Sequence, residues 1–269
     1  MDRAEINPET PMPATPAWPP KSAPRLFIDH PLALEATVTL DGSQAHYLSR
    51  VMRAGPGEVV ILCDNRTGEW AAEVLEIGKR GVSLTIRQHL RPLEAVPDFW
   101  LCPALLKKPS FDLVLEKATE LGVRRIQPVI TRRCVADKLN PDRALTIVTE
   151  AAEQCARTAL PDLAVPLKLD ALLRDWPAER TLFFADENGG EPAASAFQGS
   201  TGPAALLVGP EGGFDDTERA AIRDLPQARP IGLGPRILRG ETAAIAGCAL
   251  WMAVAGDWQN SLARHASVP

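Results

Sequence analysis

The segment Ala204-Ala-Leu-Leu-Val-Gly-Pro-Glu-Gly-Gly-Phe214 decides the fold class of this chain. Its first five residues form a short apolar run that predicts a buried strand, and a glycine-rich loop follows at once. A second segment, Gly232-Leu-Gly-Pro-Arg-Ile-Leu-Arg-Gly-Glu-Thr-Ala243, follows the strand-like Pro230-Ile231 and leads into an alanine-rich helix. Glycine lets the backbone approach a ligand closely. We therefore expect the two loops to lie at neighbouring strand ends and to enclose one small ligand.

Strands and helices alternate around these loops, from residue 97 to residue 262. The predicted strands are Phe99–Pro103, Arg125–Ile130 and Thr181–Ala185, and the predicted helices are Ser110–Gly122, Asn140–Ala159 and Thr242–Ala255. Ser110 and Asn140 are the expected N-terminal caps of the first two helices. This alternation predicts an α/β domain with a mostly parallel sheet and covering helices. Such sheets bind ligands at the carboxyl ends of their strands, where both glycine loops are expected.

A different pattern, of short β-type runs, occupies residues 25–92. The runs are 26–28, 36–40, 58–62, 69–75 and 81–86, with one short helix expected over 43–53. Several strands within one small region predict a β-barrel. Prolines at positions 92 and 97 mark the boundary to the α/β domain. Residues 1–24 contain seven prolines and few periodic apolar positions, which predicts a disordered leader.

The charge pattern leaves two interpretations open. A net charge of −5 does not favour a polyanionic partner for the chain as a whole. Residues 104–143 differ from this average, because they carry nine Lys and Arg against five Asp and Glu. Phosphate contacts are local, so a basic face in this region can hold an RNA backbone. The alternative is an ordinary solvated face, and charge alone does not separate the two.

Several kinds of protein are disfavoured by what the sequence lacks. The five cysteines are scattered without a Cys-x-x-Cys pair, which predicts reduced thiols in a cytoplasmic protein. The histidines have no metal-binding spacing, so no metal is expected. The longest apolar stretch, Ala243–Ala255, is too short to cross a membrane. Without Gly-x-Gly-x-x-Gly, Gly-Lys-Ser/Thr or Gly-x-Ser-x-Gly, a dinucleotide-dependent oxidoreductase, a P-loop enzyme and a serine hydrolase are all unsupported.

A series of short motifs, in their order and spacing, resembles the RsmE family, the 16S ribosomal RNA uridine-N3 methyltransferases of the SPOUT superfamily. The resemblance covers nearly the whole chain after residue 24. Its motifs are Arg25-Leu-Phe27, His46-Tyr-Leu-Ser-Arg-Val-Met-Arg53, Lys117-Ala-Thr-Glu-Leu-Gly-Val123, Ile126-Gln-Pro-Val129, Glu150-Ala-Ala-Glu-Gln154 with Arg157, Val208–Phe214 and Leu233–Arg239. The pattern departs at Gly240, because the family usually has a threonine at this place, between Arg239 and Glu241.

The resemblance implies an N-terminal PUA-like β-barrel that helps hold RNA and a C-terminal SPOUT domain with a trefoil knot. It also implies S-adenosyl-L-methionine as cofactor, 16S rRNA within the 30S subunit as partner, and a homodimer whose interface completes the active site. The 242–255 helix fits this implication. Its apolar residues Ile245, Leu250, Trp251 and Met252 exceed what one core face needs, so we expect part of them to pack on a partner subunit.

The resemblance also implies roles for individual residues. Arg236 or Arg239 would stabilise charge on the uracil carbonyl oxygens, and Glu211 or Glu241 is the candidate base. Arg25, Arg50 and Arg53 would contact RNA phosphates. The cofactor would be held by main-chain groups and apolar side chains of Leu207, Val208, Gly209, Pro210, Gly212, Ile231, Leu233, Gly234, Ile237 and Leu238. Another RNA-modifying SPOUT methyltransferase, or a non-catalytic PUA-type RNA-binding protein, is the alternative.

Overall fold

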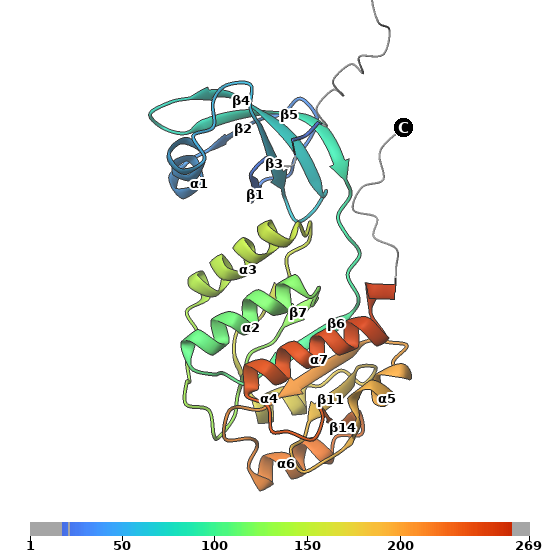
Figure 1. Ribbon diagram of the computed structural model, residues 1–269. Coiled ribbons are helices and arrows are strands. Elements are labelled where there is room, and N and C mark those ends of the chain that lie inside the picture. Colours follow the sequence, from blue (N-terminus) through green and yellow to red (C-terminus); the bar gives the residue numbers. More distant parts are fainter. Residues whose placement is uncertain (1–17, 21, 260–269) are drawn as a thin grey trace, which may run out of the picture. The chain divides into compact units, whose positions relative to one another are not determined.

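The computed structural model describes residues 18–20 and 22–259, which divide between Arg91 and Pro92 into two compact units (Figure 1). Most of the leader expected over 1–24, and the last three residues of the expected 97–262 domain, lie outside the described residues. Across the part of the chain that is described, no helix has both the length and the apolar character of a membrane span.

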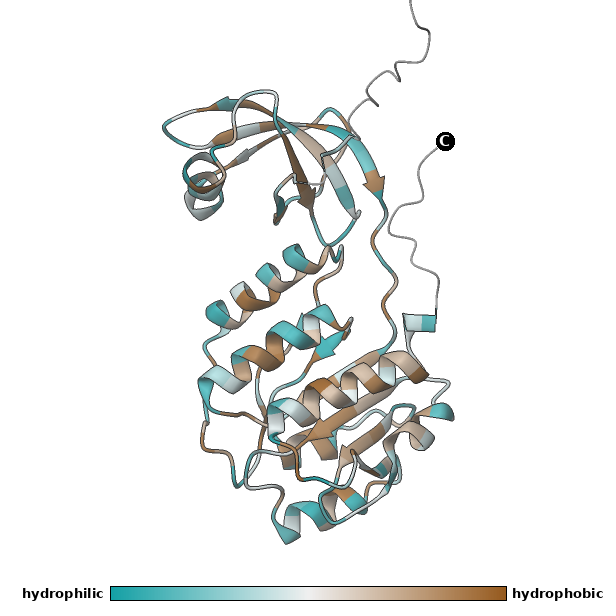
Figure 2. Ribbon diagram, viewed as in Figure 1, coloured by the Kyte–Doolittle hydropathy of each residue, from teal (hydrophilic) through white to brown (hydrophobic). Residues whose placement is uncertain are grey.

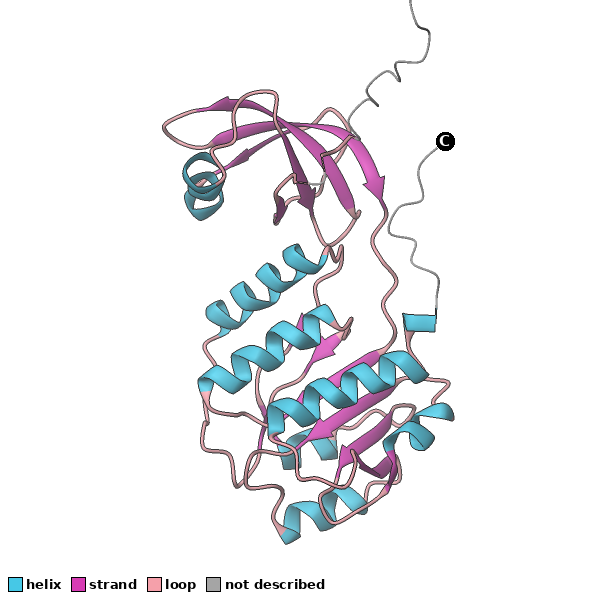
Figure 3. Cartoon of the chain, viewed as in Figure 1, coloured by secondary structure: helices cyan, strands magenta, loops and turns pink. Residues whose placement is uncertain are grey.

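The first unit is a strongly bent five-stranded sheet (Figure 3). Its strands are β1 (Arg25–Phe27), β2 (Thr37–Leu40), β3 (Val59–Cys63), β4 (Glu69–Ile77) and β5 (Val82–Arg91), in the order β1-β3-β4-β5-β2. Only β1 and β3 pair in parallel. All five expected strands are present, but β1 and β2 are edges, so backbone ladders among residues 22–91 do not close a complete barrel. The expected helix divides into α1 (Gly42–His46) and a π-helical turn, η1 (Tyr47–Val51).

The second unit is built on a seven-stranded, fully parallel sheet, as the alternation predicts. Its strands are β6 (Phe99–Pro103), β7 (Arg125–Ile126), β9 (Asp162–Leu163), β11 (Thr181–Ala185), β12 (Glu191–Pro192), β13 (Ala204–Val208) and β14 (Ala228–Gly232), in the order β12-β14-β11-β13-β6-β7-β9. The single strand predicted over 125–130 is wrong. The backbone leaves this sheet at Gln127-Pro128, and β8 (Val129–Ile130) pairs with β10 (Leu167–Lys168) instead, because proline has no N–H to donate to a ladder.

Helices cover both faces of this sheet (Figure 1). They are α2 (Lys108–Glu120), α3 (Pro141–Cys155), α4 (Leu169–Arg174), α5 (Ala193–Gln198), α6 (Asp216–Arg223) and α7 (Gly240–Val254), with a 3-10 turn, η2 (Asp257–Gln259). Alternate residues of β13 show how the faces differ: Leu206 packs in the cluster of α2, α3, α5 and α7, whereas Leu207 packs in the cluster of α4 and α6. Figure 2 shows α7 as apolar along most of its length, in contrast to the hydrophilic outer side of α6.

The helix ends follow local capping rules, with one correction. Asn140 caps α3 as predicted, accepting a hydrogen bond from the backbone N–H of Arg143 at 3.0 Å. Ser110 does not cap α2, because that helix begins two residues earlier and has Pro109 in its first turn, where the missing N–H costs no helical hydrogen bond. The trefoil knot that the resemblance implies stays a prediction.

Candidate active site

A cavity of about 310 Å³ opens at the carboxyl edge of the seven-stranded sheet. Its walls come from three segments at the ends of β11, β13 and β14, within residues 185–189, 208–214 and 231–243, together with Arg219 of α6. Both glycine segments therefore border one space. The prediction that their strands are neighbours is wrong, because β11 lies between β13 and β14 and its end forms the third wall. The volume is at the lower end of the roughly 300–1,000 Å³ typical of small-molecule sites.

Most of the predicted cofactor-binding residues line this cavity. Leu207 and Gly212 do not. The side chain of Leu207 points to the opposite side of the sheet from Val208, since successive side chains of a strand alternate, and it is fully buried among residues of α4 and α6. The predicted residues that line the cavity are Val208, Gly209, Pro210, Ile231, Leu233, Gly234, Ile237 and Leu238.

Gly212 lies on the outer side of its loop, against the segment that follows β8. Arg133 Nη1 donates a hydrogen bond to the Gly212 carbonyl at 2.7 Å. A Cβ atom at position 212 would lie 3.4 Å from the Cβ of Arg133. A side chain at this position would therefore lie against Arg133 and not against a ligand in the cavity. The arginine fixes the shape of the loop from outside.

The loop after β14 offers main-chain donors to the cavity. Within the described part of the chain, the backbone N–H groups of Gly234, Arg236, Ile237, Leu238 and Arg239 donate to no protein acceptor. Gly234 has a φ of +104°, a backbone conformation that glycine adopts without steric cost. Free N–H and C=O groups beside apolar side chains fit a ligand with a heterocyclic ring and polar edges.

The third wall contains a charged network that the sequence interpretation missed. Asp186 directly follows β11, and its carboxylate is fully buried. Arg219 of α6 donates to one oxygen of this carboxylate, and Arg223 donates to the other at 2.6 Å. Arg219 also reaches Glu187 at 3.1 Å and the Phe214 carbonyl at 3.3 Å. The signal in the sequence was the run Asp186-Glu-Asn-Gly-Gly190 after a buried strand, which resembles the other two loops in having charges beside glycines.

The four predicted catalytic residues are all on the two glycine segments, but only Arg236 lines the cavity. Arg236, Arg239 and Glu211 are exposed, and Glu241 is half-buried in the first turn of α7. Among the residues described, none of the four side chains has a hydrogen bond or an ion pair to another residue. These charges are consequently free to meet a substrate outside the cavity mouth.

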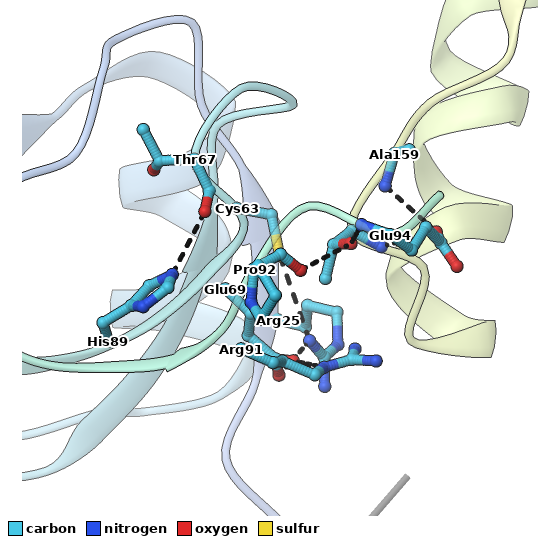
Figure 4. Close-up of polar contacts among 10 residues, drawn as sticks. Arg25, Cys63, Thr67, Glu69, His89, Arg91, Pro92, Glu94 and Ala159 are labelled. Atoms are coloured by element: carbon cyan, nitrogen blue, oxygen red, sulfur yellow. Dashed lines mark hydrogen bonds and ion pairs between the residues drawn. The ribbon is translucent and has the colours of Figure 1, made fainter. Parts of the chain in front are cut away.

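Arg25, predicted to contact RNA, has a different environment from the one expected (Figure 4). It pairs with the buried carboxylate of Glu69, which also accepts from Arg91. The Arg25 side chain is only 18% exposed. Burial raises the pKa of the neighbouring Cys63 thiol to about 12, so this thiol stays neutral. The guanidinium of Arg25 is occupied by a protein carboxylate and is poorly placed to bind a phosphate.

Arg50 and Arg53 differ from Arg25, because both are exposed. Arg50 lies in η1, and Arg53 follows it with a φ of +55°. Within the described residues neither side chain has an ion pair. These two arginines remain the available cations of the predicted RNA-binding set.

Much of the basic stretch 104–143 is neutralised within the protein. Lys117 bonds to Glu120 at 2.8 Å, the ion pair that its helical spacing of three favours. Three more cations of the stretch 104–143 form ion pairs: Arg125 with Asp162, Arg132 with Asp215 and Arg143 with Asp112. The interpretation as a solvated face accounts for these four. It leaves five cations without ion pairs among the residues described: Lys107, Lys108, Arg124, Lys138 and Arg133, the last of which donates to the Gly212 carbonyl instead.

All five cysteines are free thiols. No group of three or more His, Cys, Asp or Glu side chains within the described residues is arranged to hold a metal ion.

Comparison with known proteins decides the family. An RNA methyltransferase domain model matches residues 94–252, and an RNA methyltransferase PUA domain model matches residues 40–87. The ribosomal RNA small subunit methyltransferase E of Synechocystis sp. is 34% identical over 230 residues, covering 81% of this chain and 74% of its own length. The chain belongs to the ribosomal RNA small subunit methyltransferase E family. The RsmE protein of Rickettsia conorii, 29% identical over 225 residues, covers 82% of this chain and 91% of its own length.

Solved structures agree with the assignment to the RsmE family. The ribosomal RNA small subunit methyltransferase E of Neisseria gonorrhoeae, bound to S-adenosyl methionine, has a TM-score of 0.80 at 27% identity, over 88% of this chain and 99% of its own. A putative methyltransferase of Legionella pneumophila, in complex with the bound cofactor SAM, has a TM-score of 0.77 at 29% identity, over 87% of this chain and 99% of its own. The α/β unit is therefore a SPOUT-type methyltransferase domain, joined to a PUA-like unit.

Proposed function

We propose that this chain transfers the methyl group of S-adenosyl-L-methionine to N3 of a uridine in 16S rRNA of the small ribosomal subunit. The observation that carries the proposal is the cavity bordered by both glycine segments, in a fold shared with an RsmE protein that binds S-adenosyl methionine. A ribosomal substrate implies a reaction in the cytoplasm.

The residues of the cavity fit this cofactor. The apolar side chains of Ile231, Leu233 and Leu238 lie beside free backbone N–H groups of the same loop, which suits an adenine ring and its polar edge. Pro210 and the glycines at 209 and 213 form the opposite wall, where the backbone can approach the methionine part. When bound, S-adenosyl-L-methionine supplies an electrophilic methyl group.

The chemistry left to the protein is to orient uracil and to remove its N3 proton. The electron pair of the N3–H bond becomes the N–CH₃ bond, the S–CH₃ electrons stay on sulfur, and the proton leaves to a carboxylate or to water. Arg236, at the cavity wall, is the cation best placed to stabilise negative charge on the uracil oxygens, with Arg239 as the second candidate. Glu211 and Glu241 are the candidate bases, because neither carboxylate is engaged by another described residue.

Substrate RNA would be held partly by the PUA-like unit. Arg50 and Arg53 are the exposed cations for this role, whereas Arg25 is assigned to the structural pair with Glu69. Phosphate contacts of this kind position an RNA without reading its bases. The proposed partner is 16S rRNA as assembled in the 30S subunit.

A homodimer is part of the same proposal, and α7 is its candidate contact. The sequence-based list for this contact needs correction. Trp251 and Met252 are buried within their own subunit, and Trp251 stacks on Phe99 with 4.1 Å between ring centroids. Ile245 and Leu250 are only partly buried, so of the four predicted residues these two are left to pack against a second copy.

The test is a transfer assay with radiolabelled S-adenosyl-L-methionine and 30S subunits that lack the modification. The expected product is N3-methyluridine at one position, mapped by nuclease digestion and mass spectrometry. Arg236→Ala and Arg239→Ala should lower turnover at least about 100-fold, with cofactor binding kept. A protein that binds 30S subunits and S-adenosyl-L-methionine but transfers no methyl group would support the non-catalytic alternative, and label on another base would indicate a different methyltransferase.

A further inference from the structure

Glu187 is an acidic residue of the cavity wall that the proposed reaction does not use. It lies in the segment after β11, between the two glycine loops, and its side chain is 43% exposed. Because a charged carboxylate at a small-molecule cavity can pair only with donors, its surroundings indicate which part of a ligand it meets.

The position of the Glu187 carboxylate is fixed from two sides. Arg219 donates to its Oε1 at 3.1 Å, and the same guanidinium is anchored by Asp186 and by the Phe214 carbonyl. The glycine loop lies directly against it: Gly213 has a φ of +66°, and a Cβ atom there would come within 2.6 Å of Glu187 Oε1. A side chain at position 213 would be strained by this φ and would require the Glu187 carboxylate to move away from the loop. The close approach indicates that the acid and the loop act on the same ligand.

The charges around Glu187 favour an uncharged hydrogen-bond donor on the ligand. Oε1 is engaged by Arg219, whereas Oε2 accepts no hydrogen bond from the described residues. The guanidinium offsets the negative charge that would attract the ammonium group of a ligand, but it leaves Oε2 able to accept from hydroxyl groups. In other α/β folds, an acidic side chain beside the phosphate-binding loop takes the ribose hydroxyls of a nucleotide.

We infer that Glu187 accepts hydrogen bonds from the ribose 2′- and 3′-hydroxyl groups of the cofactor and so selects a ribonucleoside ligand. This inference rests on the proposed function, because it takes the ligand to be S-adenosyl-L-methionine. It adds a recognition residue from the third wall of the cavity, and it assigns Arg219 the task of holding that residue in place.

The inference is tested by calorimetry on the full chain with three ligands. They are S-adenosyl-L-methionine, 5′-methylthioadenosine, which keeps the ribose but lacks the ammonium and carboxylate groups, and 2′,3′-dideoxy-5′-methylthioadenosine, which also lacks the diol. Glu187→Gln should weaken binding of the first two by a similar factor, about tenfold or more, since a hydrogen bond to a charged group is lost. It should leave binding of the dideoxy ligand unchanged.

Glu191→Gln is the matched control, because Glu191 is an exposed glutamate of the same connection that does not line the cavity, and its affinities should equal those of the wild type. If Glu187→Gln weakens S-adenosyl-L-methionine but not 5′-methylthioadenosine, the carboxylate pairs with the ammonium group and the inference is wrong. Unchanged affinity for both ligands would overturn it as well. A wild-type protein that binds neither ligand would instead overturn the proposed function, and the inference with it.

Discussion

Gly240, the first residue of α7, lies against the carbonyl oxygen of Gly209 in the loop after β13. A Cβ atom at position 240 would stand 3.3 Å from this oxygen and 2.9 Å from Cδ2 of the buried Leu106. The two glycine segments therefore touch through their backbones where they border the cavity. The family usually has threonine at this position. In this chain the Leu106 side chain occupies the space that a side chain at position 240 would need.

Substitution of Gly240 should expose this competition for space. We expect Gly240→Ala to lower the free energy of unfolding by about 1 kcal/mol, because an added methyl group presses on a well-packed side chain. Leu106→Ala alone should lower the free energy of unfolding by about 2–5 kcal/mol. The double variant should lose less than the sum of the two single losses, because the space freed at Leu106 accommodates the new methyl group. Urea unfolding of all four proteins measures the coupling. Strict additivity would show that Leu106 and position 240 do not compete.

Asp186→Asn should destabilise the second unit strongly. The buried carboxylate accepts from Arg219 and Arg223, and removing its charge leaves the largely buried Arg219 guanidinium without its counter-ion. Loss of one partner of a buried ion pair costs about 3–5 kcal/mol, and the half-exposed Arg223 lowers the expected value toward 3. The control is Asp175→Asn, which removes an exposed partner of Arg174 and should change stability by less than about 1 kcal/mol. Equal effects of the two substitutions, measured by thermal unfolding, would refute a special role for Asp186.

Asp64 should give the first unit an acid-sensitive stability. Burial opposes ionisation of Asp64, but hydrogen bonds from the Thr67 hydroxyl at 2.6 Å and from the backbone N–H groups of Leu32, Thr67 and Arg66 outweigh it and lower its pKa to about 2. A carboxyl with a lowered folded-state pKa stabilises the fold above its unfolded pKa, near 4, and this contribution is lost as the pH falls toward 2.

The expected size of the Asp64 effect is about 2 kcal/mol, since one pKa unit corresponds to about 1.4 kcal/mol. Urea unfolding of the wild type and of Asp64→Asn at pH values from 2 to 6 measures it. The difference between the two proteins should be largest at pH 6 and should shrink as the pH falls. A difference that stays constant over this range would contradict the prediction.

The exposed arginines of the first unit should contribute to RNA affinity without contributing to stability. Arg50→Ala and Arg53→Ala should each weaken binding to 16S rRNA and reduce the slope of log affinity against log salt by about 1, because each removes one phosphate contact. Unfolding temperatures should stay unchanged, since neither side chain has an ion pair to another described residue. Filter binding at several salt concentrations measures the slope, and an unaltered slope in both variants would remove these arginines from the RNA-binding set.

Arg25→Ala should show the reverse behaviour. Its loss leaves the buried Glu69 carboxylate with only Arg91, so we expect a lower unfolding temperature and little change in the salt dependence of RNA binding. A normal unfolding temperature combined with a reduced slope would restore Arg25 as a phosphate ligand.

The sequence by itself determined many of the strands and helices and the two glycine loops of the site. The apolar runs at Thr181–Ala185 and Ala204–Val208 are strands with the predicted bounds, and Asn140 caps its helix as predicted. The two glycine segments border one cavity, as expected from their places after strands. These features follow from short-range physics, because side-chain period, caps and glycine conformations depend on residues only a few positions apart.

Tertiary structure decided which distant residues meet. It placed β11 between β13 and β14, so that Asp186 and Glu187 join the cavity wall and reach Arg219, more than 30 positions away. It also committed Arg25 to Glu69, 44 positions along the chain, although the motif alone predicted a phosphate ligand. The physical reason is that an ion pair or a close backbone contact depends on the order of strands and the packing of helices. No local pattern of residue types encodes that order.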